Sequence, residues 1–480
     1  MPGDVPGAEF RAAMHRTADM IADYLEGIER YPVVPPIQPG DVARSLPEAP
    51  PEHPEPLDRL LDDFSALIEP NVTHWNHPGF LAYFAITGSG PGILGEALAA
   101  GLNVNAMLWR TGPAPTELEE RTCDWLRQMM DLPPVFRGHI NDTASISSLL
   151  ALAVARHRAP GLDVRSKGLS GRDLPALTVY ASDQAHSSID KAAMLLGLGA
   201  ENVRRVESDP KTFRMSVPAL ERAIAADRAA GKLPIAVVST SGSTSTTSLD
   251  PTREIAAVCR RESLWLHVDA AYGGPAAICP ELRPLFDGMD EADSIVVNPH
   301  KWLFVPVDCS ILYVRDPALL KDAFSLVPEY LKTGDAGATN LMDLGIQLGR
   351  RFRSLKLWMV IRAFGVEGLR ERIRAHCALA TRLAERVAVD PRFELAAPAP
   401  LSAVCLRLRA AEGQDEKTAN ERLLAAINAE GPFFLSHTVL NGRYAIRVAI
   451  GNIRTGERHL DALWQAFSRH GDAIRSGEGG

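Results

Sequence analysis

The sequence lacks a long apolar run and an excess of basic residues, and these absences exclude whole classes of protein. No stretch approaches the roughly 20 apolar residues that span a bilayer, and the N-terminus lacks the charged-then-apolar pattern of a signal peptide. Aspartate and glutamate (59) outnumber lysine and arginine (51), which gives a net charge of −8. We therefore expect neither a nucleic-acid surface nor a membrane-binding one.

Cysteine is also scarce, with six residues in a chain of 480. None of them forms a CxxC pair or a spacing typical of metal sites. This pattern predicts a reduced, cytoplasmic protein with no metal centre. The scattered positions are Cys123, Cys259, Cys279, Cys309, Cys377 and Cys405.

What the sequence does contain is ordinary globular composition, with 46% hydrophobic and 23% charged residues. A chain of this length exceeds what one compact core organises, so two or three domains are expected. No internal repeat of solenoid length is visible.

The N-terminal region predicts two amphipathic helices, over residues 9–30 and 57–68. A proline-rich connector, residues 31–56, separates them and disfavours regular structure. Two helices held this far apart bury little apolar surface on their own. They require another surface, either on their own large domain or on a second chain.

The central region alternates between predicted strands and predicted helices. The strands are expected at residues 177–181, 203–206, 235–240, 264–269, 294–297 and 310–314. The helices are expected at 94–102, 116–130, 143–157, 188–196, 217–230 and 252–260. Such alternation indicates βαβ units around a mainly parallel sheet, with ligands bound at the carboxyl ends of the strands.

The C-terminal region predicts a separate α+β domain. Helix is expected from residue 357 through Phe364, and again over 368–389. The rest mixes strands and helices, which excludes a simple continuation of the βαβ pattern. The strands are expected at 404–409, 433–439 and 444–448, and the helices at 418–428 and 455–467.

Two residues at strand ends carry the chemistry. Lys301 follows the apolar strand at 294–297, and Asp269 closes the apolar strand at 264–269 ahead of small residues. A lone lysine there is usually a surface residue. A desolvated lysine, however, has a lowered pKa and forms a Schiff base with an aldehyde. An aspartate can hold a pyridinium nitrogen protonated, so the pair matches what pyridoxal phosphate requires.

The runs HVDAAYGG, residues 267–274, and NPHKW, residues 298–302, are highly specific in combination. The chain resembles the pyridoxal-phosphate-dependent group II decarboxylases, and within them the aromatic-L-amino-acid decarboxylases. The resemblance runs from the N-terminal helices to about residue 460. It implies an α/β protein of pyridoxal-phosphate fold type I, the aspartate-aminotransferase-like fold. Residues 1–90 would be a helical arm, 91–365 a large cofactor domain with a mainly parallel seven-stranded sheet, and 366–480 a small α+β domain.

The resemblance also implies a set of site residues and a homodimer whose arm packs on the partner. The catalytic residues would be Lys301, Asp269, His186 and Tyr330. Tyr330 would lie on a polar, glycine-containing lid and would protonate the carbanion that remains after carbon dioxide leaves. His186 would stack on the cofactor ring, and the helix start at 143–145 would bind the phosphate. The implied cofactor contacts are Ala144, Ser145, His186, Thr244, Asp269, Ala271, Asn298, His300 and Lys301.

The implied substrate pocket departs from the animal enzymes at several positions. Ala85 and Ile86 replace a usual Pro-Thr pair, and Met107 replaces an aromatic residue. Asp142 stands where those enzymes have glycine, and an acid near a phosphate is unfavourable unless it turns away. In related plant enzymes, glycine at the Gly349 position goes with indole substrates because it leaves more room. The implied substrate contacts are Tyr83, Phe84, Ala85, Ile86, Met107 and Gly349.

The resulting hypothesis is decarboxylation of an aromatic L-amino acid to its arylalkylamine. Tryptophan or 5-hydroxytryptophan is favoured by Gly349, with DOPA, tyrosine and phenylalanine left open. A glutamate decarboxylase is one alternative, although residues 83–86 offer no cation for a side-chain carboxylate. An aldehyde-forming deaminase, which carries phenylalanine at the Tyr330 position, and a non-catalytic scaffold of the same fold are the others.

Overall fold

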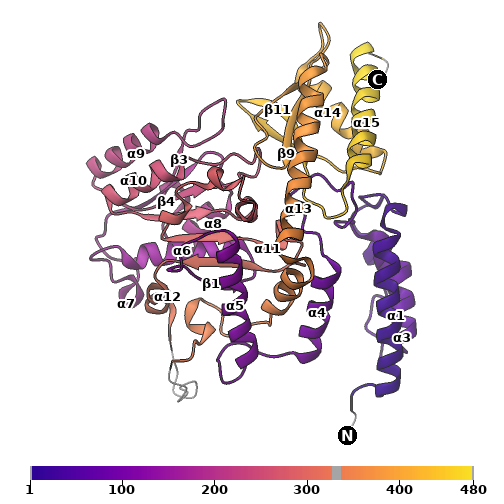
Figure 1. Ribbon diagram of the computed structural model, residues 1–480, viewed down its shortest axis with the longest axis horizontal. Helices are drawn as coiled ribbons and strands as arrows, with labels where there is room; N and C mark the ends of the chain where they lie inside the picture. The colour runs from indigo at the N-terminus through magenta and orange to yellow at the C-terminus, as the bar shows by residue number, and fades with distance from the viewer. Residues whose placement is uncertain (1–2, 327–336, 478–480) are drawn as a thin grey trace.

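The computed structural model describes residues 3–326 and 337–477. Its large domain is built on a seven-stranded sheet in the order β1-β7-β6-β5-β4-β2-β3 (Figure 1). β7 runs antiparallel to its neighbours β1 and β6. The remaining strands, from β6 through β5, β4 and β2 to β3, are parallel to one another. The strands are β1(Arg137–Asn141), β2(Leu177–Ser182), β3(Val203–Val206), β4(Leu233–Thr240), β5(Trp265–Asp269), β6(Ser294–Val297) and β7(Ser310–Val314).

Helices cover both faces of this sheet, which is why its central strands are continuous apolar runs. One apolar cluster joins the sheet to α5, α9, α10 and α13, and another joins it to α6, α8 and α12. The helices of this region are α4(Gly90–Leu102), α5(Pro113–Met129), α6(Ala144–Arg158), α7(Val164–Lys167), α8(Ser188–Leu195), α9(Val217–Ala229), α10(Thr252–Glu262), α11(Pro299–Trp302) and α12(Pro317–Phe324).

The mainly parallel fold-type-I architecture predicted from the sequence is confirmed. All six expected strands are present, three of them with identical bounds, and each expected helix lies within a few residues of an observed one. β1 was not expected. Lys301, which was expected just after the strand at 294–297, lies there in the single helical turn α11.

The small domain has a four-stranded antiparallel sheet in the order β10-β11-β9-β8. α13(Ser354–Val389) joins it to the large domain and breaks at Gly365, whose φ of +64° favours glycine. An apolar cluster of its own fills the space between sheet and helices. Its other elements are β8(Phe393–Leu395), β9(Ala403–Leu408), α14(Glu416–Ala429), β10(Ser436–Leu440), β11(Arg443–Ala449) and α15(Glu457–Ser476).

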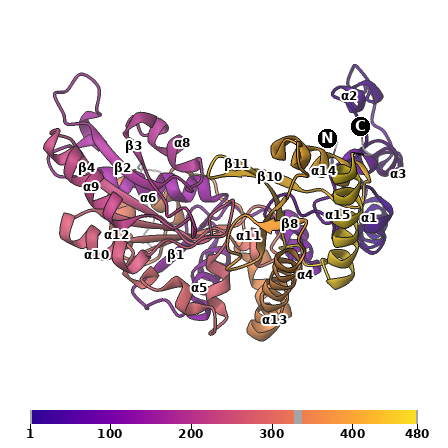
Figure 2. The ribbon, with the colours of Figure 1, turned by 90° about the horizontal axis from the view of Figure 1, so that it is seen from above.

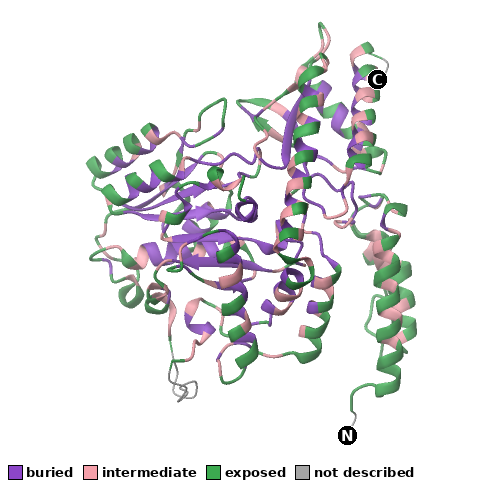
Figure 3. Ribbon diagram, in the orientation of Figure 1, coloured by how far each residue is buried: buried purple, intermediate pink, exposed green. Residues whose placement is uncertain are grey.

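The N-terminal helices α1(Gly7–Glu26) and α3(Leu57–Asp63) stand apart from the large domain, beyond the small one (Figures 1 and 2). Neither helix buries a single residue, and both are mostly exposed in Figure 3. The proline-rich connector was expected to lack regular structure, but it contains the short helix α2(Asp41–Ser45). No helix in the described part of the chain is long and apolar enough to cross a membrane.

Five histidines are buried, and burial lowers the pKa of each. The pKa falls to about 4 for His77, His267 and His376, and to about 3 for His139 and His300. Each stays neutral in the folded chain near pH 5, whereas the unfolded chain protonates it below about 6.5. Their contribution to stability is therefore present above pH 6.5 and is lost as the pH falls toward 4.

We predict that the melting temperature drops steeply between about pH 7 and about pH 5, since each such histidine costs up to about 1.4 kcal/mol per pH unit. Asp250, whose pKa burial raises to about 6, opposes only part of this loss. Scanning calorimetry of His376→Gln should show a shallower pH dependence than wild type. His15→Gln, at an exposed position on α1, is the control and should match wild type. A flat profile in the wild-type protein would contradict the prediction.

Candidate active site

A cavity of about 250 Å³ opens where the carboxyl ends of β2, β4, β5 and β6 meet. All nine residues predicted to contact the cofactor line it, together with Phe84 from the N-terminal segment. Parallel strands bring these distant positions to one edge of the sheet. The lining residues are Phe84, Thr143, Ala144, Ser145, His186, Ser188, Thr240, Gly242, Thr244, Asp269, Ala271, Tyr272, Asn298, His300 and Lys301.

Lys301 is held against this cavity by the helical turn α11, which Pro299 begins. Desolvation of the ammonium lowers the pKa of Lys301, and the charge of Arg447 adds to this effect. Asp269 acts in the opposite direction. A lowered pKa favours the neutral amine, which is the nucleophilic form of a lysine.

Asp269 and His186 approach Lys301 from two other strand ends. Asp269 is buried and accepts a hydrogen bond from the backbone N–H of Ala271 at 3.1 Å. The Nδ1 atom of His186 accepts from the backbone N–H of Ser188 at 3.1 Å, so the neutral ring carries its proton on Nε2. Desolvation lowers the pKa of His186, the charge of Asp269 raises it, and the charge of Lys301 lowers it further.

One end of the cavity suits an anion. The helix α6 begins there at Ala144 without a side-chain cap, so its first N–H groups remain available to a bound phosphate. Two buried oxygen atoms in the lining, Thr240 Oγ1 and Asn298 Oδ1, have no hydrogen-bond partner among the described residues. Unpaired buried polar atoms beside a lysine and an aspartate fit a polar aromatic aldehyde that carries a phosphate.

Asp142, the acid that departs from the animal enzymes, does not line the cavity. One of its carboxylate oxygens accepts from Gln347 Nε2 at 3.1 Å, and the other accepts from the backbone N–H and the hydroxyl group of Thr143. Because Thr143 lines the cavity at the start of α6, the charge of Asp142 lies next to the predicted phosphate end although its side chain does not enter the cavity.

Three stacked, nearly parallel rings extend inward from one wall of the cavity, which Phe84 and Tyr272 line. The ring of Phe84 lies 3.4 Å from that of Tyr272 at an angle of 8°, and Tyr272 lies 4.7 Å from Trp302. Trp302 Nε1–H donates in the plane of its ring to His376 Nδ1 of α13 at 3.0 Å, so these two rings lie edge to edge in nearly one plane. The neighbour of Lys301 is thereby fixed to the helix that joins the two domains.

Of the six predicted substrate contacts, only Phe84 lines the cavity within this chain. Ala85 is fully buried behind it, Ile86 is half-buried and Tyr83 is half-exposed. The other two lie elsewhere. Met107 packs with Leu108 and Met342, and Gly349 borders a separate hollow with Asn105 and Arg350. Tyr330 lies outside the described residues.

Several lining residues were not singled out from the sequence. Tyr272 lies within the motif HVDAAYGG, so the motif itself carried the signal. Gly242, with a φ of +100°, allows the turn after β4 to pack directly on Gly273, where a Cβ would approach the backbone nitrogen to 2.8 Å. Arg447, whose charge acts on Lys301 although it does not line the cavity, gave no signal, because it is a single basic residue within the apolar run of a small-domain strand.

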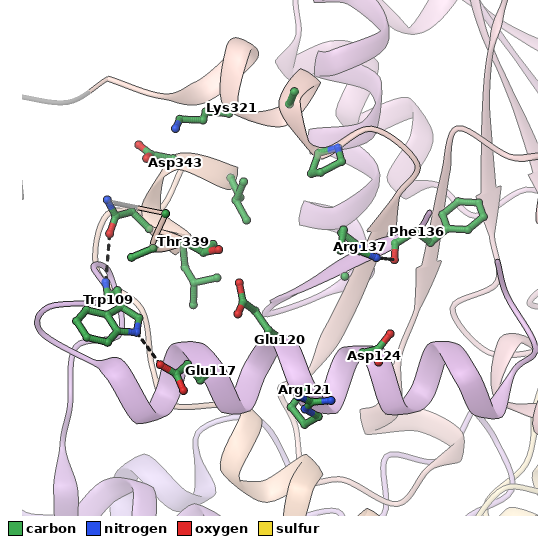
Figure 4. A pocket seen from close by; sticks show the side chains of 18 of the residues that line it. Trp109, Glu117, Glu120, Arg121, Asp124, Phe136, Arg137, Lys321, Thr339 and Asp343 are labelled. Carbon is green, nitrogen blue, oxygen red and sulfur yellow. Dashed lines mark hydrogen bonds between the residues drawn. The ribbon is translucent and has the colours of Figure 1, made fainter. Parts of the chain in front are cut away.

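A larger hollow of about 1050 Å³ lies on another side of the large domain (Figure 4). Charged side chains of α5, among them Glu117 and Glu120, face it, and Trp109 Nε1 donates to Glu117 at 2.9 Å. It shares no lining residue with the Lys301 cavity. Size alone therefore does not identify the reactive site in this molecule.

Known proteins share this whole arrangement. Residues 39–409 match the model of the pyridoxal-dependent decarboxylase conserved domain. The chain is 40% identical to tryptophan decarboxylase 2 of Oryza sativa subsp. japonica, over 95% of this chain and 93% of that protein. It is 41% identical to phenylacetaldehyde synthase of Arabidopsis thaliana, over 95% and 94%.

A solved structure agrees closely with the fold. The crystal structure of Oryza sativa TDC with PLP and tryptamine superimposes with a TM-score of 0.95 at 36% identity, covering 99% of this chain and all of that one. The match extends over every domain described above. The chain belongs to the pyridoxal-dependent decarboxylases, as one of those that remove carbon dioxide from aromatic L-amino acids with pyridoxal 5′-phosphate.

Proposed function

We propose that Lys301 binds the cofactor covalently, Asp269 faces its ring nitrogen, His186 covers its ring and the start of α6 holds its phosphate. The observation that carries this assignment is the single cavity that all these residues line. Thr244, Ala271, Asn298 and His300 complete the contacts. Pyridoxal 5′-phosphate, when bound, supplies an aldehyde for amines and a ring that withdraws electrons from the substrate.

The charges of the site support these roles. A lowered pKa gives Lys301 the neutral amine that attack on an aldehyde needs. The carboxylate of Asp269 stabilises a proton on a ring nitrogen placed beside it. His186 remains neutral at physiological pH, so its flat ring packs on another ring without bringing a second cation next to Lys301.

For the substrate, we propose tryptophan or 5-hydroxytryptophan ahead of DOPA, tyrosine and phenylalanine. Two observations support a bulky aromatic side chain. First, Phe84 offers an apolar wall. Second, the fold of this chain does not require glycine at position 349, since an added Cβ would meet only Asn105 at 3.9 Å, so the space there is available to a ligand. The rice relative solved with tryptamine is consistent with an indole.

We predict that Lys301→Ala lowers kcat by roughly a thousandfold or more and removes the visible absorption band of the bound cofactor. Circular dichroism should remain that of wild type, because the substitution removes only the amine. Lys321→Ala, on the rim of the larger hollow, is the matched control and should keep both activity and absorption. Turnover by Lys301→Ala near the wild-type rate would reject the assignment.

Tyr330 completes the proposal as the acid that delivers a proton to the α-carbon after carbon dioxide leaves. The support is its position in the resemblance, together with a relative that is an aldehyde synthase, since failure of that protonation leads to aldehyde.

Tyr330→Phe should still bind cofactor and release carbon dioxide. Dioxygen would then take two electrons from the unprotonated carbanion and leave as peroxide, and hydrolysis by water would release aldehyde and ammonia in place of amine. Chromatography of the product and an oxygen electrode measure both outcomes. Tyr444→Phe, on the small-domain strand β11, should yield only amine. If Tyr330→Phe makes amine at the wild-type rate, the proton-donor role is wrong.

The enzyme is proposed to be a homodimer, with the N-terminal arm of one chain lying across the other. Large apolar side chains on α1 and α4 face solvent in the single chain. Leu94, Leu98 and Leu102 recur every fourth residue of α4 with exposures of 59%, 55% and 62%. A contiguous apolar face of this kind is typical of a subunit interface.

Sedimentation equilibrium should show a dimer for the wild type and a monomer for the double substitution Leu94→Glu and Leu98→Glu. Buried carboxylates in an apolar interface are strongly unfavourable, so the association should weaken by at least about a thousandfold. Val389→Glu, at an isolated residue with 82% exposure, should remain dimeric. An active wild-type monomer at working concentration would defeat the proposal.

A cytoplasmic location belongs to the same proposal. Its support is the six cysteines, all free and five of them buried, which suit a reducing compartment.

A further inference from the structure

Arg447, on β11 of the small domain, is an almost fully buried cation with 3% exposure. Its Nη1 donates to the carbonyl of Ala82 at 2.7 Å, and its Nε donates to the carbonyl of Ser245 at 3.2 Å. Its Nη2 has no hydrogen-bond partner within residues 3–326 and 337–477. Among the described residues no carboxylate pairs with it, and burial lowers the pKa of the guanidinium. An unpaired buried charge is costly, so a role that offsets this cost has to be sought.

The two carbonyls that Arg447 binds belong to two walls of the cofactor cavity. Ala82 precedes Phe84 by two residues, and Ser245 is the neighbour of Thr244; Phe84 and Thr244 both line the cavity. Other small-domain side chains each reach only one of the two walls. Ser436 Oγ donates to the Ala82 carbonyl, Cys405 Sγ donates to the Ser245 carbonyl, and Ser245 Oγ bonds Thr438 Oγ1 at 2.9 Å.

The guanidinium also lies close to Lys301. Its Cζ is 4.6 Å from the centre of the Phe84 ring, and the Lys301 Nζ is 5.7 Å from the same centre. Two cations therefore share one aromatic ring, whose other neighbour is Tyr272. The position of the ring, and the charge beside the amine, both depend on Arg447.

We propose that Arg447 is a positioning residue of the active site, which holds the Phe84 and Thr244 walls together from the small domain and supplies the positive charge next to Lys301. It connects the sheet of one domain to the cavity of the other through two backbone carbonyls and one ring. The inference rests on the proposed role of Lys301.

The groups that face Lys301 determine which way its protonation changes when Arg447 is removed. Asp269 on β5 raises the pKa of Lys301, whereas burial and Arg447 lower it. His186 and His300 are also near, and both are neutral at physiological pH. Loss of the Arg447 charge therefore leaves Asp269 as the dominant charged neighbour. The pKa of the Lys301 nitrogen should rise, so this nitrogen keeps its proton to a higher pH.

The test is a titration of the cofactor-bound, full-length protein by its visible absorption, without substrate. In Arg447→Met, the pH at which the band changes should rise by about one unit. The dissociation constant of the cofactor, measured by equilibrium dialysis, should increase at least about tenfold as the walls loosen.

Two further variants separate charge, clamp and simple packing. Arg447→Lys keeps the charge but not the planar fork, so its band should titrate near the wild-type pH while its cofactor affinity still falls. Arg407→Met is the matched control. Arg407 is also buried on the small-domain sheet and donates to backbone carbonyls, those of Tyr444 at 2.8 Å and Leu440 at 3.1 Å, but it contacts no cavity wall. It should change thermal stability only.

The outcomes are distinguishable. If Arg447→Met titrates and binds cofactor as Arg407→Met does, Arg447 is only a packing residue and the inference is wrong. If Arg447→Lys restores both properties, the charge suffices and the clamp is rejected. If the wild-type protein shows no visible band with cofactor added, the proposed function fails instead.

Discussion

The rest of this structure depends on one constraint, the exclusion of water from basic side chains at one edge of the sheet. Lys301, His300, His186 and Arg447 all have lowered pKa values, and burial is the largest cause for each. Asp269 is the carboxylate that moderates this field. A cavity enclosed by such groups favours an anionic, electron-withdrawing ligand and keeps an amine reactive. The strands, the helical turn α11 and the small domain together keep water away from these side chains.

The fold was predictable wherever burial acts on both faces of an element. The central strands β6 and β7 are continuous apolar runs, and both were located to the residue. The edge strand β3 was also located to the residue, because buried valines begin and end it. β1 was missed because Arg137, Gly138 and His139 begin it, and as an edge strand it needs no apolar run. Residue Gly365 ends one helix and begins another, and the sequence expectation of two helical stretches reflects that break.

The site was predictable where chemistry and strand ends coincide. Lys301 and Asp269 close two neighbouring strands, and the parallel sheet brings them together without further information. The contribution of Arg447 was not predictable, because a single basic residue in the apolar run of β11 carries no sign of what it contacts. Met107 and Gly349 follow from the resemblance alone, and within one chain they border other surfaces. A resemblance carries over a role for a residue but not the surroundings that the fold gives it.

The ring stack has a consequence for how the substrate range of this enzyme can change. Phe84, Tyr272 and Trp302 come from the N-terminal segment, the loop after β5 and the turn α11, and each ring packs on the next. A substitution at Phe84 would therefore disturb Trp302, the neighbour of the reactive lysine, so a change made for recognition would also affect catalysis. Ile86, Met107 and Gly349 are not part of the stack, so substitutions at these positions would not carry that cost.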